Sequence, residues 1–339
     1  MAIDHERVAN PLSVTVVGAG ILGLWQALTL SRQGHRVRLV EKSATPFAES
    51  ASRYAGAMLA PGCESENTPE VRDLGPRGLA LWREVYPHLV NGGSLVVAAP
   101  RDYPELSRFA KATAPPETLD ANGLAALEPD LGGRFQSAFF FPDEAHMVTP
   151  DALEFLLDAV RLSGAVVELG AAWTSPSAAD VIIDCRGMSA SRDLPVLRGV
   201  RGERLLIRSE DVHLSRPVRL LHPRHPLYVV PWGGGRYVVG ATVIESEDAG
   251  GMTVRSALDL LGAAYTLHPA FGEAEIVDAG AGVRPAFPDN LPHVEIRDGG
   301  GRIFVNGAFR HGFLLAPVLA EAVAGYLANQ TPHSLIVPA

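Results

Sequence analysis

The strongest constraint on this chain is a glycine-rich turn between a short apolar segment and an apolar helix. Residues 13–17 are apolar except for Ser13 and Thr15, the turn reads Gly18-Ala-Gly-Ile-Leu-Gly23, and a second apolar run ends at Glu41. The first glycine permits a tight turn, the second lets backbone approach a pyrophosphate, and the third lets the helix pack close to the sheet. The first N–H groups of the helix then point at the phosphates. The segment is therefore predicted to be the βαβ unit of a dinucleotide-binding fold.

Two further residues support a dinucleotide ligand. Gly34 stands where a helix C-terminal cap is common, and Glu41 lies roughly 20 residues beyond the glycines. A carboxylate at this position accepts hydrogen bonds from a ribose 2′-OH and repels a 2′-phosphate. NAD and FAD both satisfy this requirement, and the motif alone does not choose between them. A plain α/β turn without a ligand is disfavoured, because strand, helix and acid are all in place.

Length, charge and cysteine content limit the possible classes of protein. The 339 residues are 47% hydrophobic, so they can form a large core in one or two domains. The net charge of −9 argues against nucleic acid or an anionic membrane as a partner. We expect no membrane span, and residues 1–11 lack signal-peptide features, so a cytoplasmic protein is expected. Cys63 and Cys185 are expected to be reduced and partly buried.

A loop of small residues follows the first βαβ unit. Residues 49–61 are rich in Ala, Ser and Gly, which is typical of backbone against a flat group or of a tightly packed interdomain loop. The stretch 51–61 resembles the flavin-proximal loop of the glycine oxidase and D-amino acid oxidase family. The resemblance implies that Met58 lies beside the isoalloxazine ring and that FAD is lined by the small residues Ser52, Gly56 and Ala57.

Four later segments resemble the same family and occur in the family's order. They are an apolar strand that ends in glycine, two strands around a three-glycine turn, a block with the sequence Gly-Val-Arg-Pro, and the sequence Phe-Arg-His-Gly-Phe-Leu-Leu-Ala-Pro after a strand. Each motif is moderately specific, and their order and spacing together are strong. The segments span residues 179–187, 228–242, 279–292 and 302–317.

The sequence departs from the family pattern at two places. Arg186 replaces the small residue that usually precedes the glycine of the second FAD-contacting strand. Only residues 171–178 stand where the family has a hairpin, so the backbone contact to adenine is expected near Ala172 or Trp173.

The resemblance implies an α/β fold with a doubly wound, Rossmann-type FAD-binding domain and a second, mixed-sheet α+β substrate domain. The expected bounds are 1–85, 146–197 and 277–339 for the first domain, and 86–145 and 198–276 for the second. FAD is expected to be non-covalent, because relatives that bind flavin covalently use a late cysteine and Cys185 is the last one here. The residues implied to contact FAD are Gly18, Gly20, Ile21, Leu22, Gly23, Glu41, Lys42, Ser52, Gly56, Ala57, Met58, Gly187, Arg310, His311, Gly312, Phe313 and Leu314.

Three residues are candidates for substrate binding and catalysis. By resemblance, Arg284 binds the substrate carboxylate and Tyr228 donates its hydroxyl to the same group. Arg284 is expected on a loop stiffened by prolines. Arg310, at the start of the last helix, is the competing arginine and is expected to support the site. Without the resemblance, a surface ion pair would be the more common role for such an arginine.

Asp143, Glu144 and His146 raise the possibility of a metal site, and a polar loop is the preferred interpretation because no second histidine accompanies them.

The remaining pattern predicts a series of helices and strands. The helices are 71–86 with an interruption at Pro76, 119–129, 151–163 capped by Thr149, and 253–267 capped by Thr253. The strands are 93–99, 138–142, 165–169, a strand pair at 198–207, and a last strand at 302–307.

The best match is to the glycine oxidases of thiamine biosynthesis. The resemblance implies hydride transfer from the substrate Cα to flavin N5, an imine product, and reduction of O2 to hydrogen peroxide. Three alternatives stay open: oxidation of sarcosine or other D- or N-methyl amino acids, an NAD-dependent dehydrogenase, and a flavin-carrying subunit without catalysis. The implied partners are a small amino acid and O2, and relatives suggest a homo-oligomer.

Overall fold

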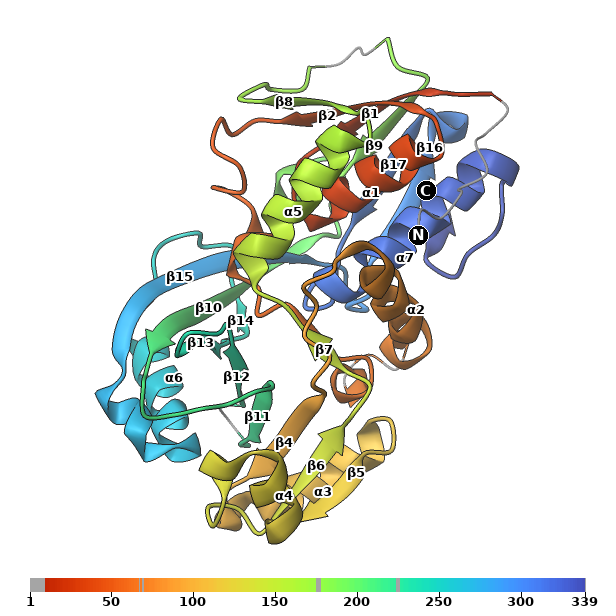
Figure 1. The fold of residues 1–339 in the computed structure, drawn as a ribbon. Helices are drawn as coiled ribbons and strands as arrows, with labels where there is room; N and C mark the ends of the chain where they lie inside the picture. The colour runs from red at the N-terminus through yellow and green to blue at the C-terminus, as the bar shows by residue number, and fades with distance from the viewer. Residues whose placement is uncertain (1–9, 67, 69, 175–177, 224–225, 339) are drawn as a thin grey trace. The chain divides into compact units, whose positions relative to one another are not determined.

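The chain forms two compact units in the computed structural model, which describes residues 10–66, 68, 70–174, 178–223 and 226–338 (Figure 1). Unit 1 comprises Met1–Arg53, Pro150–Val200 and Val283–Ala339, and unit 2 comprises Tyr54–Thr149 and Arg201–Gly282. The predicted domains differ from these units chiefly at residues 54–85, which pack within unit 2. There Glu64 forms an ion pair with Arg219. The assignment of FAD and substrate to particular domains stays a prediction.

Unit 1 is built on a seven-stranded sheet with the order β18-β16-β17-β9-β1-β2-β8. The neighbours β17, β9, β1, β2 and β8 all run parallel, as the βαβ motif predicts, and β16 is antiparallel to β17. Strands β16 and β18 were not predicted. Strand β17 is therefore not the last strand of the chain, because β18 follows it and pairs with β16. The bounds are β1 (Ser13–Val17), β2 (Arg36–Glu41), β8 (Val166–Leu169), β9 (Val181–Asp184), β16 (His293–Arg297), β17 (Arg302–Asn306) and β18 (Ile336–Pro338).

Three α-helices accompany this sheet: α1 (Ile21–Arg32), α5 (Thr149–Leu162) and α7 (Gly312–Asn329). Figure 1 shows them on one face of the sheet, where α1 packs against α7. Helix α5 includes the predicted cap Thr149 as its first residue. Two 3₁₀ segments also belong here, η5 (Gly187–Ala190) and η7 (Asp298–Gly300).

Helix α7 corrects the expectation that no segment is long and apolar enough to span a membrane. Among the described residues it is the single helix that meets both conditions, with a mean hydropathy of 1.4. However, 61% of its window is buried inside the protein, and the core helices of soluble proteins pass the same test. Its apolar composition is therefore accounted for by packing in unit 1.

Unit 2 is organised around a mixed sheet with the order β14-β10-β13-β12-β11-β4-β6-β5, and β15 pairs with β10. The hairpin predicted around the three glycines is confirmed, because β12 and β13 are antiparallel and all three glycines have positive φ. The bounds are β4 (Ser94–Ala98), β5 (Glu117–Asp120), β6 (Ser137–Phe141), β10 (Arg198–Arg208), β11 (Val218–Leu221), β12 (Leu227–Pro231), β13 (Arg236–Gly240), β14 (Ile244–Glu245) and β15 (Glu275–Ala286). A two-stranded sheet adds β3 (Met58–Leu59) and β7 (Ala145–His146).

In unit 2 one helix confirms a prediction, while another helix and one strand each correct a prediction. Helix α6 is capped as predicted, because Thr253 accepts a hydrogen bond from the backbone N–H of Ser256. Helix α2 continues through Pro76, since the buried Leu79 and Trp82 anchor the turns beyond it. Segment 198–207 is one long strand rather than a pair. The bounds are η1 (Ala51–Tyr54), η2 (Cys63–Glu66), α2 (Glu70–Val85), η3 (Pro100–Asp102), α3 (Tyr103–Ala112), α4 (Ala121–Leu127), η4 (Pro129–Leu131), α6 (Val254–Leu267) and η6 (Pro269–Glu273).

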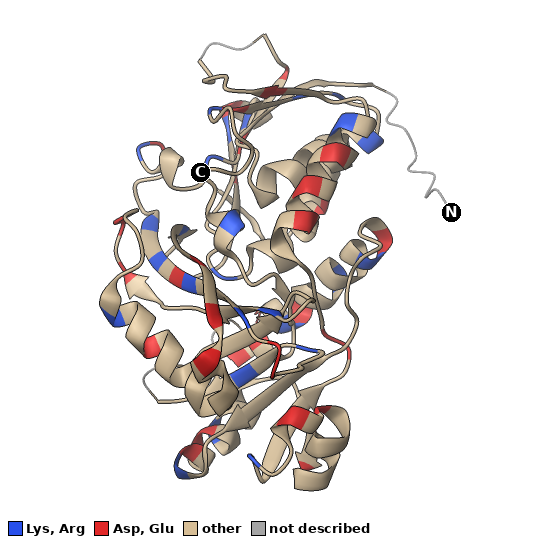
Figure 2. Ribbon diagram, turned by 60° about the vertical axis from the view of Figure 1, so that its left-hand side comes forward, with Lys and Arg blue, Asp and Glu red and all other residues tan. Residues whose placement is uncertain are grey.

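Charged residues of both signs are interspersed along the elements of each unit (Figure 2). Many form local pairs, such as Arg38 with Glu168 across β2 and β8. That a polyanion is not the partner stays a prediction.

Candidate functional site

The first feature of the candidate site is the glycine turn between β1 and α1. Gly18 has φ +98°, and a Cβ there would lie 2.7 Å from the carbonyl oxygen of Cys185. A Cβ on Gly23 would lie only 1.8 Å from the carbonyl oxygen of Gly18, so helix and strand approach as closely as predicted. Gly20 is the N-cap of α1 and makes no side-chain cap hydrogen bond. A Cβ at Gly20 would approach within 4 Å only two serine hydroxyl oxygens, so the turn can accept a pyrophosphate beside the positive helix end.

The end of β2 supplies the acid beside this turn. Glu41 accepts hydrogen bonds from the backbone N–H of Ala19 at 2.8 Å and of Ser43 at 3.0 Å. Ser52 accepts a hydrogen bond from the N–H of Ile21, the first residue of α1, at 3.1 Å. The structure therefore brings these predicted cofactor residues to one turn. Leu22 is buried, whereas Lys42 is exposed and pairs with Glu49.

The loop after β8 passes beside the carboxyl end of β2. The N–H of Ala171 donates to the carbonyl of Glu41 at 2.9 Å. Further along this loop Ala172 is exposed, and Trp173 lies under the guanidinium groups of Arg186 and Arg302, at 5.5 and 5.4 Å from the ring centre. Ala172 and Trp173 thus directly follow the residue that is hydrogen-bonded to Glu41. The adenine contact at these two residues stays a prediction.

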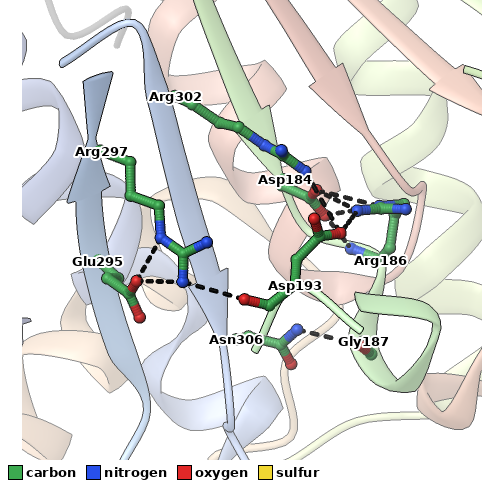
Figure 3. Close-up of polar contacts among 8 residues, drawn as sticks. All are labelled: Asp184, Arg186, Gly187, Asp193, Glu295, Arg297, Arg302 and Asn306. Carbon is green, nitrogen blue, oxygen red and sulfur yellow. Dashed lines mark hydrogen bonds and ion pairs between the residues drawn. The ribbon is translucent and has the colours of Figure 1, made fainter. Parts of the chain in front are cut away.

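Figure 3 explains why Arg186 can replace the small residue of the family pattern. Its guanidinium pairs with the fully buried Asp184 and with Asp193, each at 2.6 Å, and Arg302 approaches Asp184 at 3.1 Å. The hydrogen bond to Asp184 raises the pKa of Arg186, so this side chain stays charged. The side chain is occupied in this network, and the turn itself is made by Gly187 with φ +56°.

The segment between β17 and α7 holds the remaining predicted cofactor residues of unit 1. Arg310 is half-buried in the turn before the helix, and His311 is a buried N-cap. Gly312 begins α7, and Phe313 and Leu314 are buried in it. Because β1, β9 and β17 are parallel neighbours, their carboxyl ends meet at one edge, which is where ligands of open α/β sheets bind. We call this edge, with Gly18, Gly187 and Gly312, the cofactor edge.

In unit 2 the structure brings the small-residue loop to Tyr228. A Cβ on Gly56 would lie 2.8 Å from the Tyr228 ring, and one on Gly240 would lie 2.8 Å from its hydroxyl. Ala57 has φ +50°, and Met58 packs against an apolar cluster that includes Val230 and Trp232. The two glycines thus leave room for the tyrosine ring. This packing alone explains why glycine occurs at both positions, whether or not a ligand binds there.

Arg284 does not lie on a loop, which corrects the prediction. It is half-buried within β15, which pairs with β10. Pro285 occurs near the end of this strand, where a missing N–H is tolerated.

The acidic residues at 143–146 do not form the predicted polar loop. Glu144 and His146 are 1% and 2% exposed, and desolvation lowers the pKa of His146 to about 4. Burial raises the pKa of Glu144 to about 7, although the N–H of Cys63 donates to its carboxylate at 2.7 Å. Within the described residues there is no group of three or more His, Cys, Asp or Glu that could hold a metal.

We expect Glu144→Gln to reduce the pH dependence of stability. Because the folded-state pKa is raised from 4.5, the stabilising contribution of the bound proton is complete below pH 4.5 and is lost as pH rises through 7. The loss amounts to about 3 kcal/mol. Urea unfolding of wild type and variant between pH 5 and 8 measures it, with the exposed Glu168→Gln as control. Equal slopes in wild type and Glu144→Gln would contradict the prediction.

Cys63 and Cys185 are free and buried, as expected. Desolvation raises the pKa of both thiols, so neither is a reactive thiolate.

Sequence reasoning missed two polar residues that shape the cofactor edge. The hydroxyl of Ser50 accepts a hydrogen bond from the N–H of Ser52 at 3.2 Å. Asn306 is fully buried at the end of β17, and its side-chain amide donates a hydrogen bond to the carbonyl of Gly187. An Asn-Gly pair directly after a buried strand was the available signal for Asn306.

Comparison with known proteins gives consistent similarities. Residues 13–326 match the profile of a family described as FAD dependent oxidoreductase. A Rhizobium etli protein described as a thiamine biosynthesis oxidoreductase, ThiO, is 49% identical over 94% of this chain and 97% of its own length. A glycine oxidase of Geobacillus kaustophilus is 25% identical over 92% of this chain and 91% of its own. The crystal structure of glycine oxidase from Bacillus cereus superposes with a TM-score of 0.81 at 21% identity, covering 95% of this chain and 96% of that chain, which confirms the predicted fold class.

Proposed function

Because this chain belongs to the family of FAD-dependent oxidoreductases, we propose that it oxidises glycine or another small amino acid at Cα. The observation that carries the proposal is the 49% identity, over nearly the whole chain, to a protein described as an oxidoreductase of thiamine biosynthesis. Bound FAD would supply the acceptor for a hydride, which carries two electrons, and O2 would take up two electrons and two protons to give hydrogen peroxide. The other product is an imine, which hydrolyses or serves thiamine thiazole synthesis.

In this proposal the protein binds FAD and the amino-acid substrate and orients them for hydride transfer. The cofactor edge would hold FAD, with Gly20 and the start of α1 at the pyrophosphate and Glu41 at the ribose. Arg284 and Tyr228 would bind the substrate carboxylate, as the resemblance implies, and Arg310 would support the site. A neutral amine can release hydride as its nitrogen lone pair forms the C=N bond, so no side chain has to act as a general base.

An oxygen-uptake screen tests the proposal. Purified protein is given glycine, sarcosine, and several D- and L-amino acids, and hydrogen peroxide is measured in parallel. Fastest uptake with glycine supports the proposal, whereas preference for sarcosine or a larger D-amino acid selects the alternative substrate class. Peroxide from none of them would favour a flavin-carrying subunit. The family match already disfavours the NAD-dependent dehydrogenase.

We expect the purified protein to be yellow and to release intact FAD on heat denaturation. Both cysteines are buried thiols of raised pKa, and neither lies late in the chain, where covalently flavinylated relatives carry their cysteine. Absorbance at 450 nm, measured in the supernatant and in the pellet, distinguishes non-covalent from covalent FAD. Colour that stays with the precipitated chain would mean covalent attachment.

We also propose a cytoplasmic homo-oligomer whose partners are its substrate and O2. The burial of α7 inside unit 1 and the net charge of −9 support the cytoplasmic location, and the homo-oligomer rests on the family resemblance alone. Size-exclusion chromatography with light scattering tests the oligomeric state.

A further inference from the structure

Two glycine turns stand side by side at the cofactor edge. Gly187 follows β9 and Gly307 follows β17, and these strands are parallel neighbours in unit 1. Both turns have left-handed backbone, with φ +56° and φ +76°. A Cβ at Gly307 would lie 2.1 Å from the ring of Phe287, so only glycine fits there.

One side chain joins the two turns. The Nδ2 of Asn306 donates to the carbonyl of Gly187 at 3.0 Å (Figure 3). Its Oδ1 accepts from the N–H of Gly307 at 2.8 Å. Asn306 is 0% exposed, so water cannot replace either bond. A primary amide carries a donor and an acceptor on one carbon, whereas Leu of similar size has neither and Asp has the donor only when it is protonated.

The Gly307 turn leads directly into the start of α7. The N–H of Phe309 donates to the carbonyl of Pro285 at 2.9 Å, and the N–H of His311 donates to the carbonyl of Ala308 at 2.8 Å. Hydrogen bonds therefore hold the segment at several points between Asn306 and the start of α7, so a displacement of Gly307 should be passed to the helix start.

We propose that Asn306 is a positioning residue for the cofactor, which sets the spacing between the Gly187 turn and the first turn of α7. The proposal rests on the proposed placement of FAD at the cofactor edge and not on the identity of the substrate. Asn306 acts through the two backbone segments and does not itself touch the flavin. Its loss should therefore change both the affinity for FAD and the environment of the bound ring.

The test uses the full-length protein without substrate, so that a failure of the proposed amino-acid oxidation would not affect it. Asn306→Leu removes both bonds at similar volume. We expect the FAD dissociation constant to rise about 10-fold or more, because two buried hydrogen bonds are lost, and the visible flavin spectrum and midpoint potential to shift. Arg297→Met is the matched control, because Arg297 also has two polar contacts but lies on β16, beside Arg302 at the start of β17 and away from Asn306 at its end.

A second variant keeps the proposal testable if Asn306→Leu folds poorly. Asn306→Asp retains the acceptor for Gly307, and its protonated form also regains a donor for the Gly187 carbonyl. Its FAD affinity should therefore approach that of wild type at low pH and fall as pH rises, while the wild type changes less. The proposal is overturned if these variants leave FAD affinity, spectrum and potential at wild-type values, whatever their effect on the melting temperature.

Discussion

Gly20→Val is expected to give a folded chain that contains no FAD. The backbone at Gly20 has φ −73° and ψ −178°, a conformation that β-branched residues adopt readily. Its Cβ would meet only the hydroxyl oxygens of Ser50 at 3.1 Å and Ser52 at 3.6 Å, which can rotate away. The added methyl groups would instead occupy the space that a pyrophosphate needs at the start of α1.

Two other glycines provide the controls for this prediction. In Gly23→Ala the new Cβ would overlap the backbone oxygen of Gly18, so the melting temperature of the apoprotein should fall as well. In Gly262→Ala, within α6, the Cβ has no atom within 4 Å, so FAD content and stability should be preserved. The ratio of flavin to protein absorbance and thermal unfolding by circular dichroism separate the three cases. Stoichiometric FAD in Gly20→Val would place the phosphates elsewhere.

Arg284→Lys is expected to retain FAD and to lose roughly 10²-fold or more in kcat/KM. A near-attack geometry requires the substrate Cα about 3–3.5 Å from the hydride acceptor, and the planar guanidinium can fix a carboxylate bidentately. Lysine replaces this fork with a point charge. Tyr228→Phe should lose less, because one neutral hydrogen bond contributes less than a bidentate ion pair.

A pair of substrates distinguishes binding from a structural role for Arg284. Glycine carries the carboxylate and methylamine lacks it, so Arg284→Lys should impair oxidation of glycine far more than that of methylamine. Arg208→Lys, in an exposed ion pair with Glu275, is the control for a surface arginine and should leave both rates unchanged. If Arg284→Lys impairs both substrates equally, the carboxylate role passes to Arg310.

The features that could be predicted from sequence are those whose physical requirement is local. The turn at Gly18 needs a positive φ, and the cap at Thr253 needs a hydroxyl next to a helix start, so both can be recognised from a few consecutive residues. The family resemblance extended prediction to the fold class, which the structural likeness confirms.

The features that were missed depend on partners far along the chain. Edge strand β5 is mostly exposed, and no alternating pattern marks it. Glu144 looked like part of a polar loop, because its burial follows from packing beside Cys63, which is distant in sequence. Arg186 departed from the family pattern, and the acid that it pairs with, Asp184, is also contacted by Arg302, more than a hundred residues later.

The order of the unit 1 sheet has a consequence for synthesis of the chain on the ribosome. The adjacent strands β1, β9 and β17 come from residues 13–17, 181–184 and 302–306, and all of unit 2 is translated before the third. A nascent chain can therefore complete unit 2 while the centre of the other sheet still lacks a neighbour, and closing contacts over such sequence separations is slow. If FAD binds at the cofactor edge as proposed, it can be captured only after β17 and α7 have emerged, and acquisition of the yellow colour would then report that translation has passed α7.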